Sequence, residues 1–169
     1  MKAASAPNRS GQLTPGGRFA AAAPADEDFE ISPQRTMAQN VPAELQTSIN
    51  RQVLDHVAGL SAHSDIVEAL GAAVKPLGDV QTFCPDSQEY RYVVASTKGI
   101  IIALAVGMNT IGFRLDERMK ARALASGGLP YAECGKEWVS FTLFRSDWPK
   151  IDVEFWARKA YVAARELER

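Results

Sequence analysis

Apolar residues recur at steps of three and four over residues 42–60, and this spacing predicts an amphipathic helix. The apolar positions are Leu45, Ile49, Val53, Leu54, Val57 and Leu60. Pro42 suits the first turn of this helix, because its missing N–H is not needed there. Ser64 and Asp65 are typical of an N-cap and first turn, so a second helix is predicted to begin there and to end before Pro76. Its inward positions are Ile66, Leu70, Ala73 and Val74.

From Asp79 onward the pattern is that of strands. Alternating apolar positions and β-branched residues predict strands at 80–84, 90–96, 100–106, 110–115 and 138–144. The strand at 100–106 is apolar on both faces, which indicates a central strand covered from both sides. The run Thr97-Lys98-Gly99 before it is typical of a hairpin turn.

Two further helices are predicted in the second half of the chain. Asp116 is expected to cap a short helix over residues 117–126, which Gly127 and Gly128 end. Asp152 is expected to open the last helix. Its packing stripe comprises Phe155, Trp156, Lys159, Ala160, Ala163 and Leu167. The element order ααββββαβα predicts an α+β fold, with an antiparallel sheet of about four or five strands flanked by helices.

Residues 1–40 differ in composition from the rest. Pro, Gly, Ala and Ser are frequent there, and the few large apolar residues repeat at neither a helical nor a strand period. Such a stretch cannot bury enough surface to offset the loss of chain entropy. A disordered tail over residues 1–40 is therefore expected, followed by a single domain over residues 41–169.

Composition and charge narrow the functional classes. The chain of 169 residues carries 19 Lys and Arg against 20 Asp and Glu, so no global field draws it to nucleic acid or anionic lipid. Its longest apolar run, 100–106, is far shorter than the roughly 20 residues of a membrane-spanning helix. Cys84 and Cys134 are expected to be ordinary small residues of a reducing compartment, although a single disulfide stays open. A cytoplasmic location is expected.

Short motifs in the later half carry a family resemblance. Residues Phe113-Arg114-Leu115-Asp116 form an apolar-Arg-apolar-acid step at a predicted strand end, and Gly127-Gly128-Leu129-Pro130-Tyr131 follows an Ala-rich helix. A strand beginning near Trp138 and the run from Trp156 to Tyr161 in the closing helix complete the pattern. From about residue 99 to 164 the chain resembles the TfoX amino-terminal domain and the related MmcQ/YjbR proteins.

The resemblance implies a small cytoplasmic domain without a catalytic site. Some members of this family are linked to DNA binding or competence regulation. The fold is also similar to that of type III secretion chaperones, which bind extended partner segments, usually as dimers. The leading interpretation is a non-enzymatic domain that binds a protein partner. A weak DNA-binding or regulatory domain is the alternative, a secretion-chaperone-like protein is a further one, and a homodimer is compatible with each.

Two sets of residues are candidate contacts. Arg114, Arg118 and Arg122 crowd one short region, and Arg91 is expected on an adjacent strand, so these four are candidate phosphate ligands for nucleic acid. A solvated helix face that pairs with surface acids is the favoured interpretation of these residues, because the chain is nearly neutral and nucleic-acid binders usually have a clearly basic face. Trp148, in a predicted loop, is a candidate protein contact; a loop tryptophan covering the edge of the core is the other interpretation.

No constellation in the sequence favours catalysis. The motifs GxSxG, GxGxxG and GxxxxGK[ST] do not occur, and the carboxylate pair Asp116/Glu117 is explained as a helix N-terminus. Gly59 and Ser61 interrupt the helix that would place His56 and His63 on one face, so no metal site is expected. No cofactor is expected either. Phe141 and Trp156 are predicted to be core residues that matter for stability alone.

Overall fold

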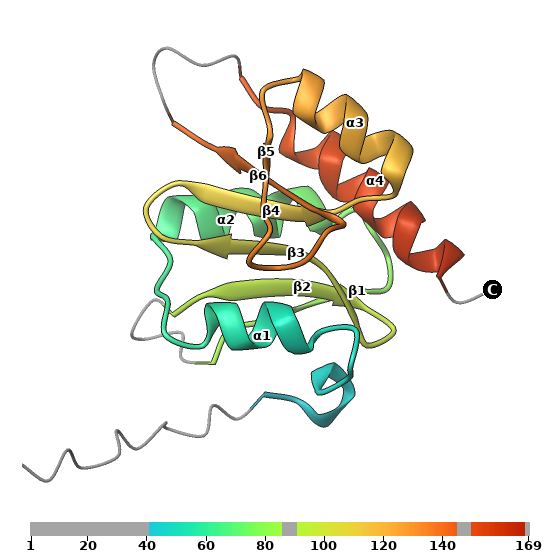
Figure 1. Cartoon of the computed structure of the whole chain (residues 1–169). Coiled ribbons are helices and arrows are strands. Elements are labelled where there is room, and N and C mark those ends of the chain that lie inside the picture. Colours follow the sequence, from blue (N-terminus) through green and yellow to red (C-terminus); the bar gives the residue numbers. More distant parts are fainter. Residues whose placement is uncertain (1–40, 86–90, 145–149, 168–169) are drawn as a thin grey trace, which may run out of the picture. The chain divides into compact units, whose positions relative to one another are not determined.

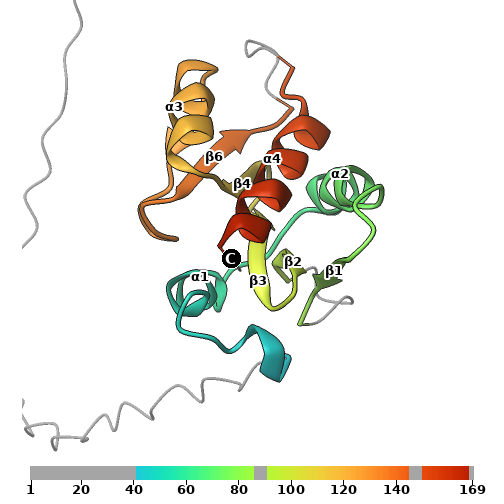
Figure 2. The ribbon, with the colours of Figure 1, turned by 90° about the vertical axis from the view of Figure 1, so that its right-hand side faces the viewer.

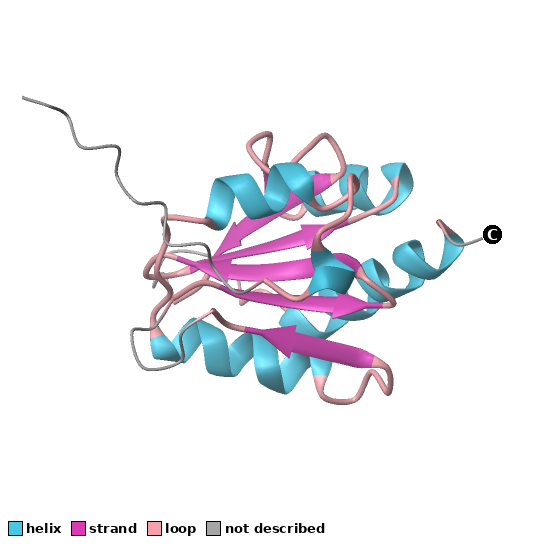
Figure 3. Ribbon diagram, turned by 90° about the horizontal axis from the view of Figure 1, so that it is seen from below, coloured by secondary structure: helices cyan, strands magenta, loops and turns pink. Residues whose placement is uncertain are grey.

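Strand β3, the run of apolar residues Ile100–Val106, lies inside a six-stranded sheet in the computed structural model of the chain (Figure 1). The structure describes residues 41–85, 91–144 and 150–167, which fall within one compact unit. The strand order is β1-β2-β3-β4-β6-β5, and every neighbouring pair is antiparallel (Figure 3). The α+β prediction is therefore confirmed, with six strands in place of four or five. The tail predicted for residues 1–40 and the candidate Trp148 lie outside the described residues.

Except for one short strand and the first helix, the remaining strands and helices lie close to the positions that the sequence predicts. The other strands are β1 (Val80–Phe83), β2 (Val93–Thr97), β4 (Thr110–Arg114), β5 (Leu129–Pro130) and β6 (Trp138–Thr142). The helices are the 3₁₀ turn η1 (Ala43–Leu45), α1 (Arg51–Val57), α2 (Ser64–Val74), α3 (Glu117–Ala125) and α4 (Val153–Glu166). Most predicted strands are found one or two residues shorter, and Phe144, expected within a strand, lies beyond β6 and is exposed.

Helices cover both faces of the sheet, as the doubly apolar β3 predicts. One face packs against α2, α4 and Ala123 of α3, and the other against η1 and α1 (Figure 2). A β-bulge between β2 and β3 pairs Ala95 with Ala103 but Ser96 with Ile101. The bulge inserts one extra residue, Ile102, and so shifts which side chains of β3 meet each helical layer.

The long helix predicted over residues 42–60 is wrong, because the chain breaks between η1 and α1. Asn50 lies at this break with no exposed surface. Its Nδ2 donates to the carbonyls of Leu45 (3.0 Å) and Gly99 (2.6 Å), and its Oδ1 accepts from the N–H of Ile101 (3.0 Å). A continuous helix would use the Leu45 carbonyl within itself. The tertiary bonds to the β2–β3 hairpin replace those helical bonds.

The β2–β3 hairpin turn meets the sequence prediction and also receives η1. Lys98 and Gly99 both have positive φ, which the tight turn requires. A Cβ atom on Gly99 would lie 2.7 Å from the carbonyl oxygen of Glu44. Glycine is therefore needed here for the close approach of η1 as well as for the backbone conformation.

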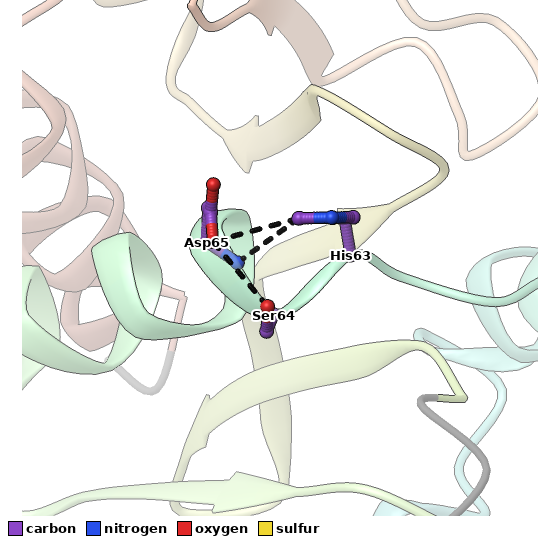
Figure 4. A network of polar contacts seen from close by, with 3 residues as sticks. All are labelled: His63, Ser64 and Asp65. Atoms are coloured by element: carbon purple, nitrogen blue, oxygen red, sulfur yellow. Dashed lines mark hydrogen bonds and ion pairs between the residues drawn. The ribbon is translucent and has the colours of Figure 1, made fainter.

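Helix caps agree with the sequence at two of three predicted positions. Asp116 and Asp152 accept hydrogen bonds from the N–H groups of Met119 and Phe155, each at 2.8 Å. The cap predicted at Ser64 is wrong by one residue. His63 precedes α2 and its Nδ1 accepts from the N–H of Asp65 at 3.3 Å, while Ser64 is already helical (Figure 4).

The strand that the sequence did not predict is β5. It has two residues, Leu129 and Pro130, which pair with Ser140 and Val139 of β6. Glycine and proline residues next to Leu129 are typical of a loop, and the two residues of β5 are too few to show the apolar alternation of a strand. The backbone pairing with β6 returns the chain from α3 to the sheet edge and fixes α3 beside β6.

Candidate functional site

The four arginines proposed as phosphate ligands do not form one surface. Arg114 is only 5% exposed. Its Nη2 donates to the carbonyl of Ile49 at 2.7 Å, and its guanidinium lies 5.4 Å from the ring of Trp138. Burial lowers the pKa of Arg114, and the charge of Glu137 opposes that shift. The side chain therefore supports the break before α1 and does not reach a phosphate on the surface.

Arg118 and Arg122 are the two candidates that the structure brings together. Both are exposed on α3, one helical turn apart. Arg91 is half-buried and forms an isolated bridge with Ser61, before α2. Arg118 and Arg122 lie far from Arg91 in the strand order, because α3 packs against β5 and β6 at one end of the sheet and Arg91 precedes β2 near the other end. Two of the four cations thus remain for a common ligand.

A groove of about 650 Å³ opens between the end of α3 and the start of α4. Arg122 and residues 125–127 line it from the α3 side, and Lys150, Ile151, Phe155 and Trp156 line it from the α4 side. Its wall is mainly apolar, and its charged lining residues are the cations Arg122 and Lys150 and the carboxylate Asp152. This combination suits a ligand that has both an apolar part and a negative charge.

A stack of aromatic rings connects the groove with the core. Phe113 and Phe141 meet edge to face with their centroids 6.2 Å apart, and Phe141 stacks on Trp156 at 5.3 Å. Trp156 in turn contacts Phe155 edge to face at 4.9 Å. Phe141 and Trp156 are 1% and 4% exposed, so their predicted core positions are confirmed. The half-buried Phe155 is thereby held on rigid neighbours.

Two cations from different helices converge on Phe155. The Arg122 guanidinium of α3 lies 4.8 Å from the ring centroid, and the Lys159 ammonium of α4 lies 5.3 Å from it. Both distances are within the range of cation–π interaction. These two cations therefore lie within about 10 Å of each other, the sum of two such contacts. Within the described ranges, neither has a carboxylate at ion-pair distance.

A smaller hollow of about 410 Å³ continues along α4. Asp152, Glu154, Phe155, Arg158 and Lys159 line it. Both carboxylates are already engaged: Asp152 caps α4, and Glu154 accepts from Arg158 at 2.7 Å. We call these two hollows, which share Asp152 and Phe155, the α3–α4 groove. Arg122 and Lys150 line its larger hollow, and Lys159 lines its smaller one.

A third hollow, beside α1, offers little chemistry. It measures about 450 Å³ and includes His56, whose Nε2 lies 3.0 Å from the hydroxyl of Tyr131. Burial is the main cause that raises the pKa of Tyr131 above its usual range. Burial likewise raises the pKa of the nearby Cys134 thiol to about 12. Neither group is activated as a nucleophile by its surroundings.

The cysteines are free thiols in the structure, and Cys134 is buried, as expected from the sequence, while Cys84 is half-buried. Among the described residues, no three His, Cys, Asp or Glu side chains gather in a way that could hold a metal ion. No helix in the same ranges is long and apolar enough to cross a membrane.

The α3–α4 groove was missed in the sequence because its residues looked structural. The sequence pattern places both Phe155 and Lys159 on the packing stripe of the last helix. The signal that could have revealed the groove is the lysine itself, since a charged residue within an apolar stripe marks the edge of the buried face.

Comparison with known proteins adds no relative: no family model, curated protein or solved structure matches the chain. The likeness to the TfoX amino-terminal domain and the YjbR proteins therefore stays a prediction from the motifs.

Proposed function

We propose that this chain is a non-enzymatic interaction domain that binds a segment of a protein partner in the α3–α4 groove. One observation carries the proposal: an open groove presents apolar side chains together with cations that have no carboxylate partner among the described residues, around an anchored aromatic ring. The resemblance to the TfoX and YjbR proteins, which implies a binding module, supports the same class of function.

The dimensions of the groove suit side chains of a bound peptide. Burying one large apolar side chain contributes about 1.5–3 kcal/mol. Two such side chains against Ile151 and Phe155, with charge-assisted contacts at the rim, account for part of the roughly 8 kcal/mol of a micromolar complex. Aromatic and arginine side chains in a hollow are also the types that dominate protein interfaces.

Weak DNA binding is the second candidate function, favoured by the exposed pair Arg118 and Arg122. Each phosphate contact contributes about −0.9 to the slope of log K against log salt. With Arg114 buried and Arg91 elsewhere, a slope of only about −2 is expected from the arginine pair. Such binding would be weak at physiological salt.

Affinity capture from the native cell extract, with the full chain as bait, tests the leading proposal. We expect a protein that is recovered with the unchanged chain and lost with Arg122→Glu. Arg51→Glu, on the exposed surface of α1, is the matched control and should retain it. Loss with Arg51→Glu and retention with Arg122→Glu would place the contact at α1 and refute the proposed site.

A gel shift at low and moderate salt tests the DNA alternative. Binding that falls with salt at a slope of about −2 in log K against log salt and is lost in Arg118→Glu would favour DNA, and no shift at micromolar protein would exclude it. A stable dimer that co-purifies with one partner would instead indicate the secretion-chaperone-like alternative.

A further inference from the structure

We infer that the α3–α4 groove selects partner segments in which carboxylates flank an aromatic or large aliphatic side chain. This inference rests on the proposed function and names the chemistry of the partner. It follows from the charge balance of the groove, from the pairing of its carboxylates, and from the position of two cations around one ring.

The charge balance of the groove is positive although that of the chain is not. Its two hollows are lined by Arg122, Lys150, Arg158 and Lys159, against the carboxylates of Asp152 and Glu154. The whole chain, in contrast, has a net charge of −1. The excess of positive charge is thus a local property of the groove, and it attracts segments of negative charge.

The carboxylates of the groove form no ion pair with Arg122 or Lys159 among the described residues. Glu154 is bound to Arg158 on its own helix, and Asp152 accepts from the N–H of Phe155. Arg122 and Lys159 instead contact only the face of the Phe155 ring among the described residues. A ring face accepts only a weak interaction, so the N–H groups of Arg122 and Lys159 can donate to carboxylates of a ligand.

The two cations also lie close to an apolar side chain of the groove. They approach the Phe155 ring from two different helices. Arg122 lines the larger hollow together with Ile151 and Phe155, and Lys159 lines the smaller hollow together with Phe155. A segment with an apolar side chain against the apolar wall of the larger hollow would place neighbouring carboxylates toward Arg122 and Lys159. A duplex phosphate backbone has no apolar side chain for the wall, so the groove favours an acidic peptide over DNA.

Fluorescence anisotropy with labelled peptides and the full chain tests the inference. The probe peptide has glutamates on both sides of a single phenylalanine; matched peptides carry glutamine or lysine in place of glutamate, or alanine in place of phenylalanine. We expect the glutamate peptide to bind about tenfold more tightly than the glutamine peptide, and its affinity to fall with salt. The alanine peptide should also bind more weakly.

Variants of the chain locate the contact. Arg122→Gln and Lys159→Gln should each weaken binding of the glutamate peptide by about threefold to tenfold. Arg165→Gln is the matched control, because its guanidinium lies 5.6 Å from the Tyr161 ring on α4 but does not line the groove. Circular dichroism confirms that each variant is folded.

Equal affinity for the glutamate and glutamine peptides would overturn the inference, as would an equal loss in Arg165→Gln. This failure is distinguishable from failure of the proposed function. A partner whose capture depends on Arg122 but whose groove-binding segment is uncharged would leave the proposed site intact and remove only the acidic specificity.

Discussion

Asn50 connects the amino-terminal segment with the central hairpin, and its replacement should destabilise the fold strongly. The side chain has no exposed surface and forms hydrogen bonds to Leu45, Gly99 and Ile101. In Asn50→Ala the Gly99 carbonyl and the Ile101 N–H lose their side-chain partner, while the Leu45 carbonyl keeps the hydrogen bond from the N–H of Thr47 at 2.8 Å. A buried hydrogen bond contributes about 0.5–1.5 kcal/mol, and a buried polar group left unpaired costs about 1–3 kcal/mol.

The expected loss is therefore about 3–5 kcal/mol of the free energy of unfolding. That is a large part of the roughly 5–15 kcal/mol of a typical domain. The thermal midpoint should fall by roughly 10–20 °C. Urea unfolding of the full chain, followed by tryptophan fluorescence and circular dichroism, measures the loss directly.

Two further variants separate hydrogen bonding from packing. Asn50→Asp keeps nearly the same side-chain volume and the acceptor for the N–H of Ile101. It also places a carboxylate beside the carbonyl oxygens of Leu45 and Gly99, which repel it. This variant should therefore be at least as destabilising as Asn50→Ala. Gln46→Ala removes one exposed bond to the Val41 carbonyl and should change stability by less than about 0.5 kcal/mol. If Asn50→Asp unfolds with the energy of the unchanged chain, the reasoning is refuted.

Three other predictions follow from the core, a thiol and a cap. Phe141→Ala should cost about 3–5 kcal/mol in urea unfolding, because it leaves a cavity between β6 and α4; a cost below 1 kcal/mol would contradict the packing. At pH 8 the half-buried Cys84 should react with a thiol reagent faster than Cys134, because the pKa of about 12 keeps the Cys134 thiol protonated in the folded state. Equal rates would contradict the burial of Cys134. Asp152→Ala should cost about 1 kcal/mol through loss of the α4 cap, and Asp152→Asn much less.

Local chemistry explains which parts of the fold could be predicted. The alternation of apolar residues, the positive-φ turn at Lys98 and Gly99, and the aspartate caps depend on near neighbours in the sequence. β3 was recognised by its apolar content alone, and it has the predicted bounds. Each of these features is determined within a few residues, so the sequence pattern contains them.

The features that were missed depend on distant partners. The sequence pattern gives Asn50 an ordinary helical position. The helix breaks there because Asn50 forms hydrogen bonds with Gly99 and Ile101, which lie 49 and 51 residues later in the chain. Arg114 ends a strand and looks exposed until the carbonyl of Ile49 covers it, 65 positions earlier. The α3–α4 groove exists because the sheet brings α3 beside the start of α4, and no local pattern records that approach.

Site-specific photo-crosslinking in the native cell tests the central claim most directly. A photoreactive residue in place of Ala125, which is exposed and lines the groove, should form a covalent adduct with a protein. The same residue in place of Val162, which is 46% exposed on α4 and outside the groove, should form little adduct. A protein adduct at position 125 that is lost with Arg122→Glu is the predicted result. An adduct at position 162 alone, or crosslinks to nucleic acid in place of protein, would contradict the account.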